Sequence, residues 1–104
     1  MSDTEQVTVR DNPEGRRFEA RLDPAAAEPA GFTEYRRREG GVVEYFHTEV
    51  DPAFEGRGVG GALARAALDD ARARGLRVRA TCPFVSGWLD RHPDYHDLRE
   101  RPSL

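Results

Sequence analysis

The pattern of apolar and polar residues divides the chain into an alternating first half and a helical second half. Up to residue 50, apolar and charged positions alternate with a period of two, which is typical of half-buried strands. Proline and glycine interrupt the alternation, so the pattern predicts an N-terminal antiparallel meander of four strands. The predicted strands cover residues 6–10, 17–22, 31–38 and 42–50, with a turn at 11–15.

From Gly58 the apolar period changes to about 3.6 residues, which indicates an amphipathic helix that ends at Gly75. Alternation returns over residues 76–82, so strand, helix and strand predict a right-handed crossover between parallel strands. Pro83 ends the strand, and a short C-terminal helix is expected before Pro93, followed by a peripheral charged tail. Together these elements predict an α/β (α+β) fold with one mixed sheet. The apolar stripe of the long helix comprises Gly60, Leu63, Ala64, Ala67, Leu68 and Ala71.

Composition and charge narrow the class of protein. With 104 residues and 38% hydrophobic composition, the chain is expected to form a single domain over residues 1–104. A net charge of −3 makes nucleic acid the least favoured partner. The polar N-terminus and the lack of a long apolar run predict a cytoplasmic protein with no membrane partner. We expect a monomer or a weak homodimer. One cysteine, Cys82, excludes an intrachain disulfide and a multi-cysteine site, so no metal is expected.

The most informative stretch joins the end of the fourth predicted strand, at Val50, to a glycine-rich turn that opens the long helix. Glycines let backbone N–H groups approach a ligand closely, and a helix N-terminus adds free amides and the positive end of its dipole. The stretch is therefore expected to hold phosphate groups. The candidate cofactor-binding residues are Val50, Gly56, Arg57, Gly58, Val59, Gly60 and Gly61.

Two familiar phosphate-binding motifs do not fit this stretch. Residues 56–61 formally satisfy G-x-G-x-x-G, but a dinucleotide fold expects an acidic residue after the next strand, and residues 80–83 contain none. A nucleotide P-loop needs a lysine, and all 16 basic residues of this chain are arginine. A glycine-rich turn without a ligand is the remaining alternative.

The run Glu55-Gly56-Arg57-Gly58-Val59-Gly60 resembles the acetyl-CoA signature of the GCN5-related N-acetyltransferases, Gln/Arg-x-x-Gly-x-Gly/Ala, with Glu55 in the Gln/Arg position. Residues 44–95, within a motif-bearing region of about 42–97, are similar to the small YjdJ-type subfamily. They include the runs His47-Thr48-Glu49-Val50, Thr81-Cys82-Pro83-Phe84-Val85 and His92-Pro93-Asp94-Tyr95.

The resemblance implies that acetyl-CoA is the co-substrate and lies where strands 42–50 and 76–82 diverge. It also implies transfer of the acetyl group to a small-molecule or peptide amine. The N-terminal hairpin and third strand stand where larger members carry two substrate-covering helices. The alternative function is therefore a CoA-binding or acetyl-CoA-binding module with little or no transferase activity.

Acetylation of an amine needs a base for the proton of the amine, and two strand glutamates are candidates. Glu44 and Glu49 lie on opposite faces unless a bulge intervenes, whereas His47 and Glu49 share one face. Glu49 is favoured, and a solvated strand carboxylate is the alternative for either residue. His47 is expected to orient a neighbour by hydrogen bonding, because no second ligand at metal-binding spacing accompanies it.

Two further residues complete the candidate catalytic set. Cys82 ends its strand where the resemblance would place the acetyl group, so its thiolate could take the acetyl group and pass it on. Its alternative is a small buried side chain. Tyr95 could protonate the departing CoA thiolate, or it could anchor the C-terminal segment. The candidate catalytic residues are therefore Cys82, Glu49 and Tyr95.

Overall fold

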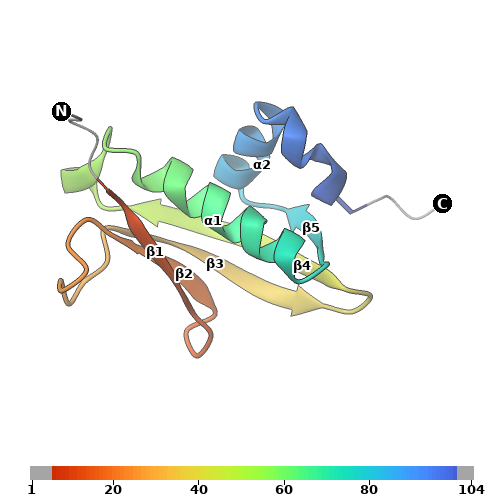
Figure 1. The fold of residues 1–104 in the computed structure, drawn as a ribbon, viewed down its shortest axis with the longest axis horizontal. Coiled ribbons are helices and arrows are strands. Elements are labelled where there is room, and N and C mark those ends of the chain that lie inside the picture. Colours follow the sequence, from red (N-terminus) through yellow and green to blue (C-terminus); the bar gives the residue numbers. More distant parts are fainter. Residues whose placement is uncertain (1–5, 101–104) are drawn as a thin grey trace.

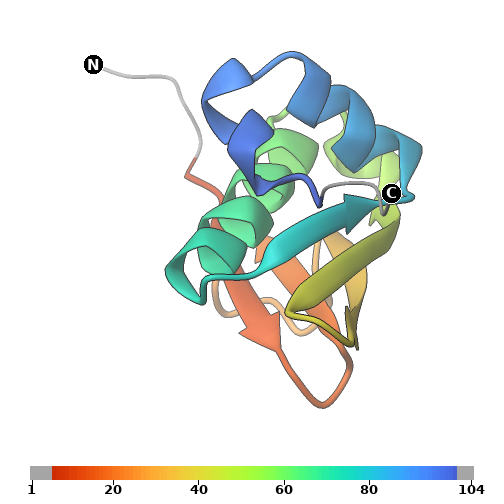
Figure 2. The same cartoon turned by 90° about the vertical axis from the view of Figure 1, so that its right-hand side faces the viewer.

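Five strands form one mixed sheet, and both α-helices cover the same face of it (Figure 1; Figure 2). The computed structural model describes residues 6–100. The first four strands pair antiparallel in chain order, and the fifth is parallel to the fourth. The strands are β1 (Thr8–Asn12), β2 (Arg17–Arg21), β3 (Gly31–Arg38), β4 (Val42–Val50) and β5 (Arg77–Ala80). The helices are α1 (Val59–Ala73) and α2 (Pro83–Asp90), with 3-10 helices η1 (Pro52–Phe54) and η2 (Pro93–Leu98).

This arrangement confirms the predicted α/β (α+β) class, the meander and the parallel strand–helix–strand unit. The bounds of β3 and β4 are those that the alternation predicts, but β1 begins and ends two residues later than expected. Asp11 and Asn12 belong to the strand because they pair with Phe18 and Arg17 across the hairpin. The turn is correspondingly tight, and the side chain of Asn12 accepts a hydrogen bond from the Gly15 N–H at 3.1 Å.

The core lies between the sheet and α1. The buried stripe of α1 is the predicted one, with Val59 in place of Gly60, and consists of Val59, Leu63, Ala64, Ala67, Leu68 and Ala71. Its alanines let the helix axis approach the sheet closely, and burial of each leucine contributes about 1.5–3 kcal/mol. Tyr45 of β4, 1% exposed, donates a hydrogen bond from its hydroxyl to the Ala67 carbonyl oxygen at 2.6 Å. This bond ties the middle of α1 to the middle of the sheet.

The C-terminal segment is not peripheral, so that expectation is wrong for residues 93–100. Helix η2 buries Tyr95 and Leu98 in the common core. Beyond it, Arg99 forms a bridge with Val78 of β5, and the Glu100 N–H donates to the Val78 carbonyl oxygen at 2.9 Å. The expectation rested on the charged composition of the segment, but the two large side chains of Tyr95 and Leu98 suffice to bury it. Residues 101–104 lie outside the described part of the chain.

The first testable prediction concerns Gly31, where β3 passes close to β4 and α1. A Cβ atom built there would lie 2.7 Å from the Glu49 carbonyl oxygen and 3.0 Å from Cγ1 of Val59. Because the first neighbour is backbone, Gly31→Ala is expected to destabilise the fold by about 1–3 kcal/mol in urea unfolding. The control is Gly87→Ala within α2, where the nearest atom is a flexible arginine terminus at 3.4 Å. Equal stability of the two variants would contradict the close approach.

Candidate functional site

Strands β4 and β5 diverge at Tyr45. The Tyr45 carbonyl oxygen accepts two backbone hydrogen bonds, from Thr81 at 3.1 Å and from Cys82 at 3.0 Å. Tyr45 and Ala80 are also the last register pair between these strands within residues 6–100. Beyond this point β4 continues to Val50, whereas the segment that follows β5 turns into α2 at Pro83. Within residues 6–100 the second half of β4 therefore has no strand paired to it on the β5 side, as the resemblance implies, and we call this divergence the opening.

The glycine-rich turn follows β4 and the short helix η1, and it leads into α1. Gly56 and Gly58 have φ angles of 79° and 80°, which L side chains rarely adopt, and Gly58 is the N-cap of α1. No side chain caps this N-terminus. Its amides and the positive end of the helix dipole are therefore available to an anion. Arg57 between these glycines lies over the Phe54 ring, with its guanidinium carbon 5.4 Å from the ring centroid.

The other two glycines of the run serve helix packing. A Cβ atom at Gly60 would lie 2.6 Å from the Phe84 ring, and one at Gly61 would lie 3.8 Å from Nε1 of Trp88. Both aromatic residues belong to α2. The interpretation of the sequence assigned all four glycines to ligand approach, whereas Gly60 and Gly61 also face the residues of the second helix. The glycine run thus positions α2 beside the opening.

A β-bulge in β4 determines on which face of the sheet the side chains of Glu44 and Glu49 lie. His47 pairs with Glu34, but Tyr45 pairs with the next residue, Tyr35, so Phe46 is an extra residue in β4. The alternation shifts by one position there. Glu44 and Glu49 consequently lie on the same face of the sheet, opposite the helices, which we call the open face.

Glu44 is fully engaged in structural contacts. Its carboxylate accepts hydrogen bonds from the Thr81 hydroxyl at 2.6 Å and from Nε of Arg38 at 2.9 Å. The bond from Thr81 and then that from Arg38 hold the pKa of Glu44 below its ordinary value. The residue is 7% exposed. Glu44 therefore joins β3, β4 and the start of the α2 connection as an ionised anchor.

Glu49 has the opposite surroundings, because its side chain is 62% exposed. One carboxylate oxygen lies 2.7 Å from Nε2 of His47, two residues earlier on the same face. The Phe32 ring lies beside this pair, with ring centroids of Phe32 and His47 6.1 Å apart. The structure thus joins the two polar residues that the sequence placed on one face, and both remain accessible to solvent.

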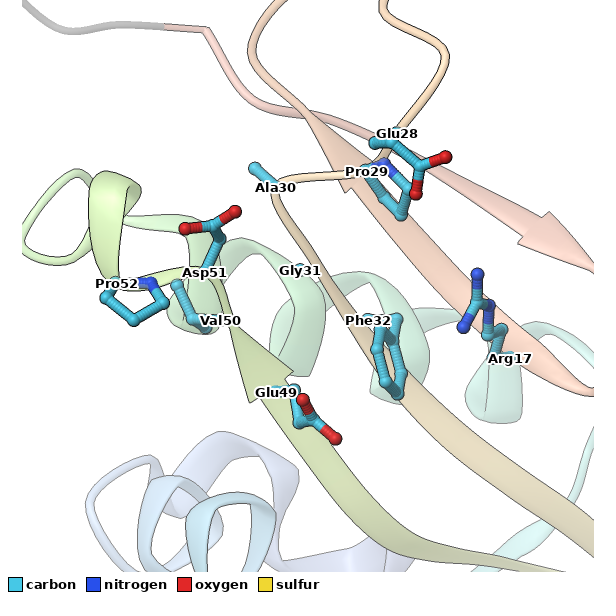
Figure 3. A pocket seen from close by; sticks show the side chains of 10 residues that line it. All are labelled: Arg17, Glu28, Pro29, Ala30, Gly31, Phe32, Glu49, Val50, Asp51 and Pro52. Atoms are coloured by element: carbon cyan, nitrogen blue, oxygen red, sulfur yellow. The ribbon is translucent and has the colours of Figure 1, made fainter.

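Glu49 also lines a surface pocket of about 350 Å³ at the end of β4 (Figure 3). Carboxylates dominate its charge, since Glu28 and Asp51 join Glu49 against a single arginine, Arg17. The guanidinium carbon of Arg17 lies 4.4 Å from the Phe32 ring centroid, which forms part of the pocket wall. Such a lining attracts a cation such as a protonated amine.

Cys82 lies at the opening, but its side chain is only 3% exposed. Its thiol donates a hydrogen bond to the Thr48 hydroxyl at 3.4 Å, and Thr48 shares a second hydrogen bond with the buried Thr33 at 2.9 Å. The thiol is thereby directed across the gap toward the second half of β4. Sequence reasoning missed both threonines, although the position of Thr48 between His47 and Glu49 on one strand was an available signal for it.

Tyr95 lies against α1, away from the bulge. Its hydroxyl donates to the Asp69 carboxylate at 2.7 Å and accepts from the Arg65 guanidinium at 3.3 Å. The hydrogen bond to Asp69, followed by burial, raises the pKa of Tyr95. Its hydrogen bonds run to α1 and none joins it to Glu49 or Cys82. This geometry corresponds to the anchoring role that the sequence left open for Tyr95.

Comparison with known proteins agrees with this architecture. The sequence profile of the family described as GCN5-related N-acetyl-transferase matches residues 17–98. Protein NATD1 from Xenopus tropicalis is 29% identical over 93 residues, covering 89% of this chain and 84% of that protein. Protein NATD1 from Bos taurus is 31% identical over 87 residues, covering 84% of this chain and 75% of that protein.

A solved structure supports the fold independently. The solution structure of a GCN5-like protein from Staphylococcus aureus is similar with a TM-score of 0.67 and 22% identity, over 98% of this chain and 94% of that one. At this identity the likeness concerns the fold alone. The sequence profile over residues 17–98 carries the assignment to a family. The chain belongs to the family of GCN5-related N-acetyltransferases.

Two features are absent from the described residues. Between residues 6 and 100 no helix is long and apolar enough to cross a membrane. In the same range no three histidine, cysteine or acidic side chains gather as metal ligands would.

The contacts of Glu44 give the second prediction, which is a pH dependence. Because its folded pKa lies below the reference value of 4.5, Glu44 contributes stability above pH 4.5 that is lost as pH falls through the folded pKa. Glu44→Gln should therefore lower the free energy of unfolding at neutral pH, and its effect should shrink in acid. Urea unfolding from about pH 7 to about pH 3 measures this. Glu39→Gln in the exposed β3–β4 turn is the control, and a deficit that persists unchanged in acid would refute the assignment.

Proposed function

We propose that this protein binds acetyl-CoA at the opening between β4 and β5 and transfers its acetyl group to an amine. The observation that carries the proposal is that the pairing of β4 with β5 ends at Tyr45, and that the unpaired half of β4 leads to a glycine turn at a helix N-terminus. Members of this family use acetyl-CoA as co-substrate. The pantetheine arm would pair with the second half of β4 like an added strand. The pyrophosphate would accept hydrogen bonds from the amides of residues 56–61.

The acceptor would enter from the open face through the pocket that contains Glu28, Glu49 and Asp51. Carboxylates there attract an ammonium group, but the attacking amine must be neutral. Glu49 is accessible and touches His47, so it can accept the proton that the amine loses. Glu44 is a poor base by comparison, because its carboxylate is occupied by Thr81 and Arg38. We therefore assign Glu49 as the base and His47 as the residue that orients it.

Substitution of Glu49 tests the assignment. Glu49→Gln is expected to lower kcat/KM for amine acetylation roughly a hundredfold while leaving the Kd for CoA unchanged, because the side chain lies on the acceptor side. Calorimetry with CoA and acetyl-CoA gives the Kd, and CoA release with a panel of amines gives the rate. Glu14→Gln, in the exposed β1–β2 turn, is the matched control.

Cofactor binding and acetyl transfer are tested by separate measurements. No binding of CoA or acetyl-CoA at millimolar concentration would overturn the cofactor site. Binding without CoA release from any amine would favour the alternative function, a CoA-binding module. That alternative is motivated by the uncovered open face and by Glu55 in the Gln/Arg position.

Cys82 offers a second route for the acetyl group. A thiol held next to a thioester can exchange with it: the acetyl–sulfur bond to CoA breaks, one forms to Sγ, and the thiol proton goes to CoA. Without an acceptor, we expect incubation with acetyl-CoA to add one acetyl group that Cys82→Ala does not acquire. Intact-mass spectrometry measures it. An adduct that survives Cys82→Ala would exclude this residue, and amine acetylation that persists in the variant would show direct transfer.

A further inference from the structure

A second cavity lies at the opposite end of α1 from the glycine turn. It has a volume of about 560 Å³ and lies between the β1–β2 turn, the second half of β3 and the C-terminal end of α1. Four arginines line it, namely Arg16, Arg36, Arg37 and Arg74, together with Asp11 and Tyr35. Because α1 rises about 1.5 Å per residue, roughly 20 Å separates this cavity from the N-terminus of α1. It is therefore distinct from the proposed acetyl-CoA site.

Two of the four arginines already have acidic partners. Arg74 forms an ion pair with Asp70 at 2.9 Å, and Arg36 lies 3.9 Å from Glu44 while stacking over the Phe46 ring. These two side chains bring little uncompensated charge to the cavity.

Arg16 and Arg37 are different. Neither guanidinium forms a hydrogen bond or an ion pair with any residue between 6 and 100, and both residues are exposed. The single acidic lining residue, Asp11, already accepts a hydrogen bond from the Tyr35 hydroxyl at 2.7 Å. That contact, with burial as the larger cause, raises the pKa of Tyr35 to about 12, so the hydroxyl stays a donor. The neutral hydroxyl does not cancel the charge of Asp11, but two unpaired guanidinium groups outnumber this one carboxylate in a cavity of a chain whose net charge is −3.

The backbone at Arg16 is also unusual. Its φ of 55° makes it the one non-glycine residue in the left-handed region among residues 6–100. The turn holds it there, since the Arg16 carbonyl oxygen accepts the Tyr35 N–H at 2.9 Å. Glycine would adopt this conformation without strain. An arginine here instead directs a guanidinium into the cavity, and strained positions of this kind gather at binding sites.

We propose that this cavity binds a small phosphate-bearing molecule through Arg16 and Arg37. Guanidinium groups match phosphate oxygens with paired N–H donors, and two of them balance the charge of one phosphate dianion. The cavity falls within the volume range of small-molecule sites. A nucleic acid fits less well, because the chain carries a net charge of −3 and so has no overall positive field to attract a polyanion.

Amide chemical shifts recorded during a titration with inorganic pyrophosphate test the proposal. Saturable shifts should appear at residues 13–16 and 35–37, and they should weaken with added salt. The titration is repeated with excess CoA, which occupies the glycine turn if the proposed function is right. Shifts confined to residues 56–61 would mean that pyrophosphate binds the turn alone and would overturn the second site. If CoA does not bind, the proposed function fails, but the shifts around Arg16 and Arg37 would still appear and would still support the second site.

Substitutions of single arginines test which guanidinium groups bind pyrophosphate. Arg37→Gln and Arg16→Gln are each expected to weaken pyrophosphate binding roughly tenfold, whereas Arg91→Gln at the end of α2 should leave it unchanged. Arg16→Gly separates binding from folding, because it should weaken binding while raising the unfolding temperature. Equal affinity in Arg37→Gln, Arg16→Gln and Arg91→Gln, or loss of affinity only where the fold is also lost, would refute the proposal.

Discussion

Tyr45 is the residue on which the rest of the architecture depends. Its carbonyl oxygen accepts the last two hydrogen bonds from the β5 side, and its hydroxyl fixes α1 through Ala67. Burial raises the pKa of Tyr45, so the hydroxyl remains a donor at neutral pH. The positions of the helix, the sheet and the divergence point therefore depend on the backbone and side chain of one residue, and the bulge begins at the next residue. Phe18 and Tyr35 pack around its ring and hold it in place.

The site and the core share residues around this point. Gly60 and Gly61 admit Phe84 and Trp88 of α2, while Gly56 and Gly58 allow the left-handed turn before α1. The same run of glycines thus shapes the proposed anion site and the packing of the second helix. Phe84 is the one large apolar side chain exposed among residues 6–100, and it lies directly over the start of α1. The cofactor proposed for the helix N-terminus would lie near this ring, which would couple its binding to the position of α2.

The sequence predicts elements better than it predicts contacts. The period of two in residues 31–50 and the period of 3.6 after Gly58 follow from burial of one face, so β3, β4 and α1 could be placed from the pattern. The bulge at Phe46 could not be placed from the pattern, because no glycine or turn residue marks it. As a result, sequence reasoning could not decide whether Glu44 and Glu49 share a face. The bond between Tyr95 and Asp69 joins residues 26 positions apart, and only the fold brings them together.

The open face explains how a sheet covered on one side avoids a large apolar patch. Each aromatic ring on it is covered by an arginine: Arg17 lies over Phe32, and Arg36 lies over Phe46. Ion pairs between neighbouring strands fill the remaining positions, as between Arg38 and Glu44. No helix of residues 6–100 encloses an acceptor there. Selection of the proposed amine must then rest on the charge and shape at the end of β4, which would admit a peptide end as readily as a small amine.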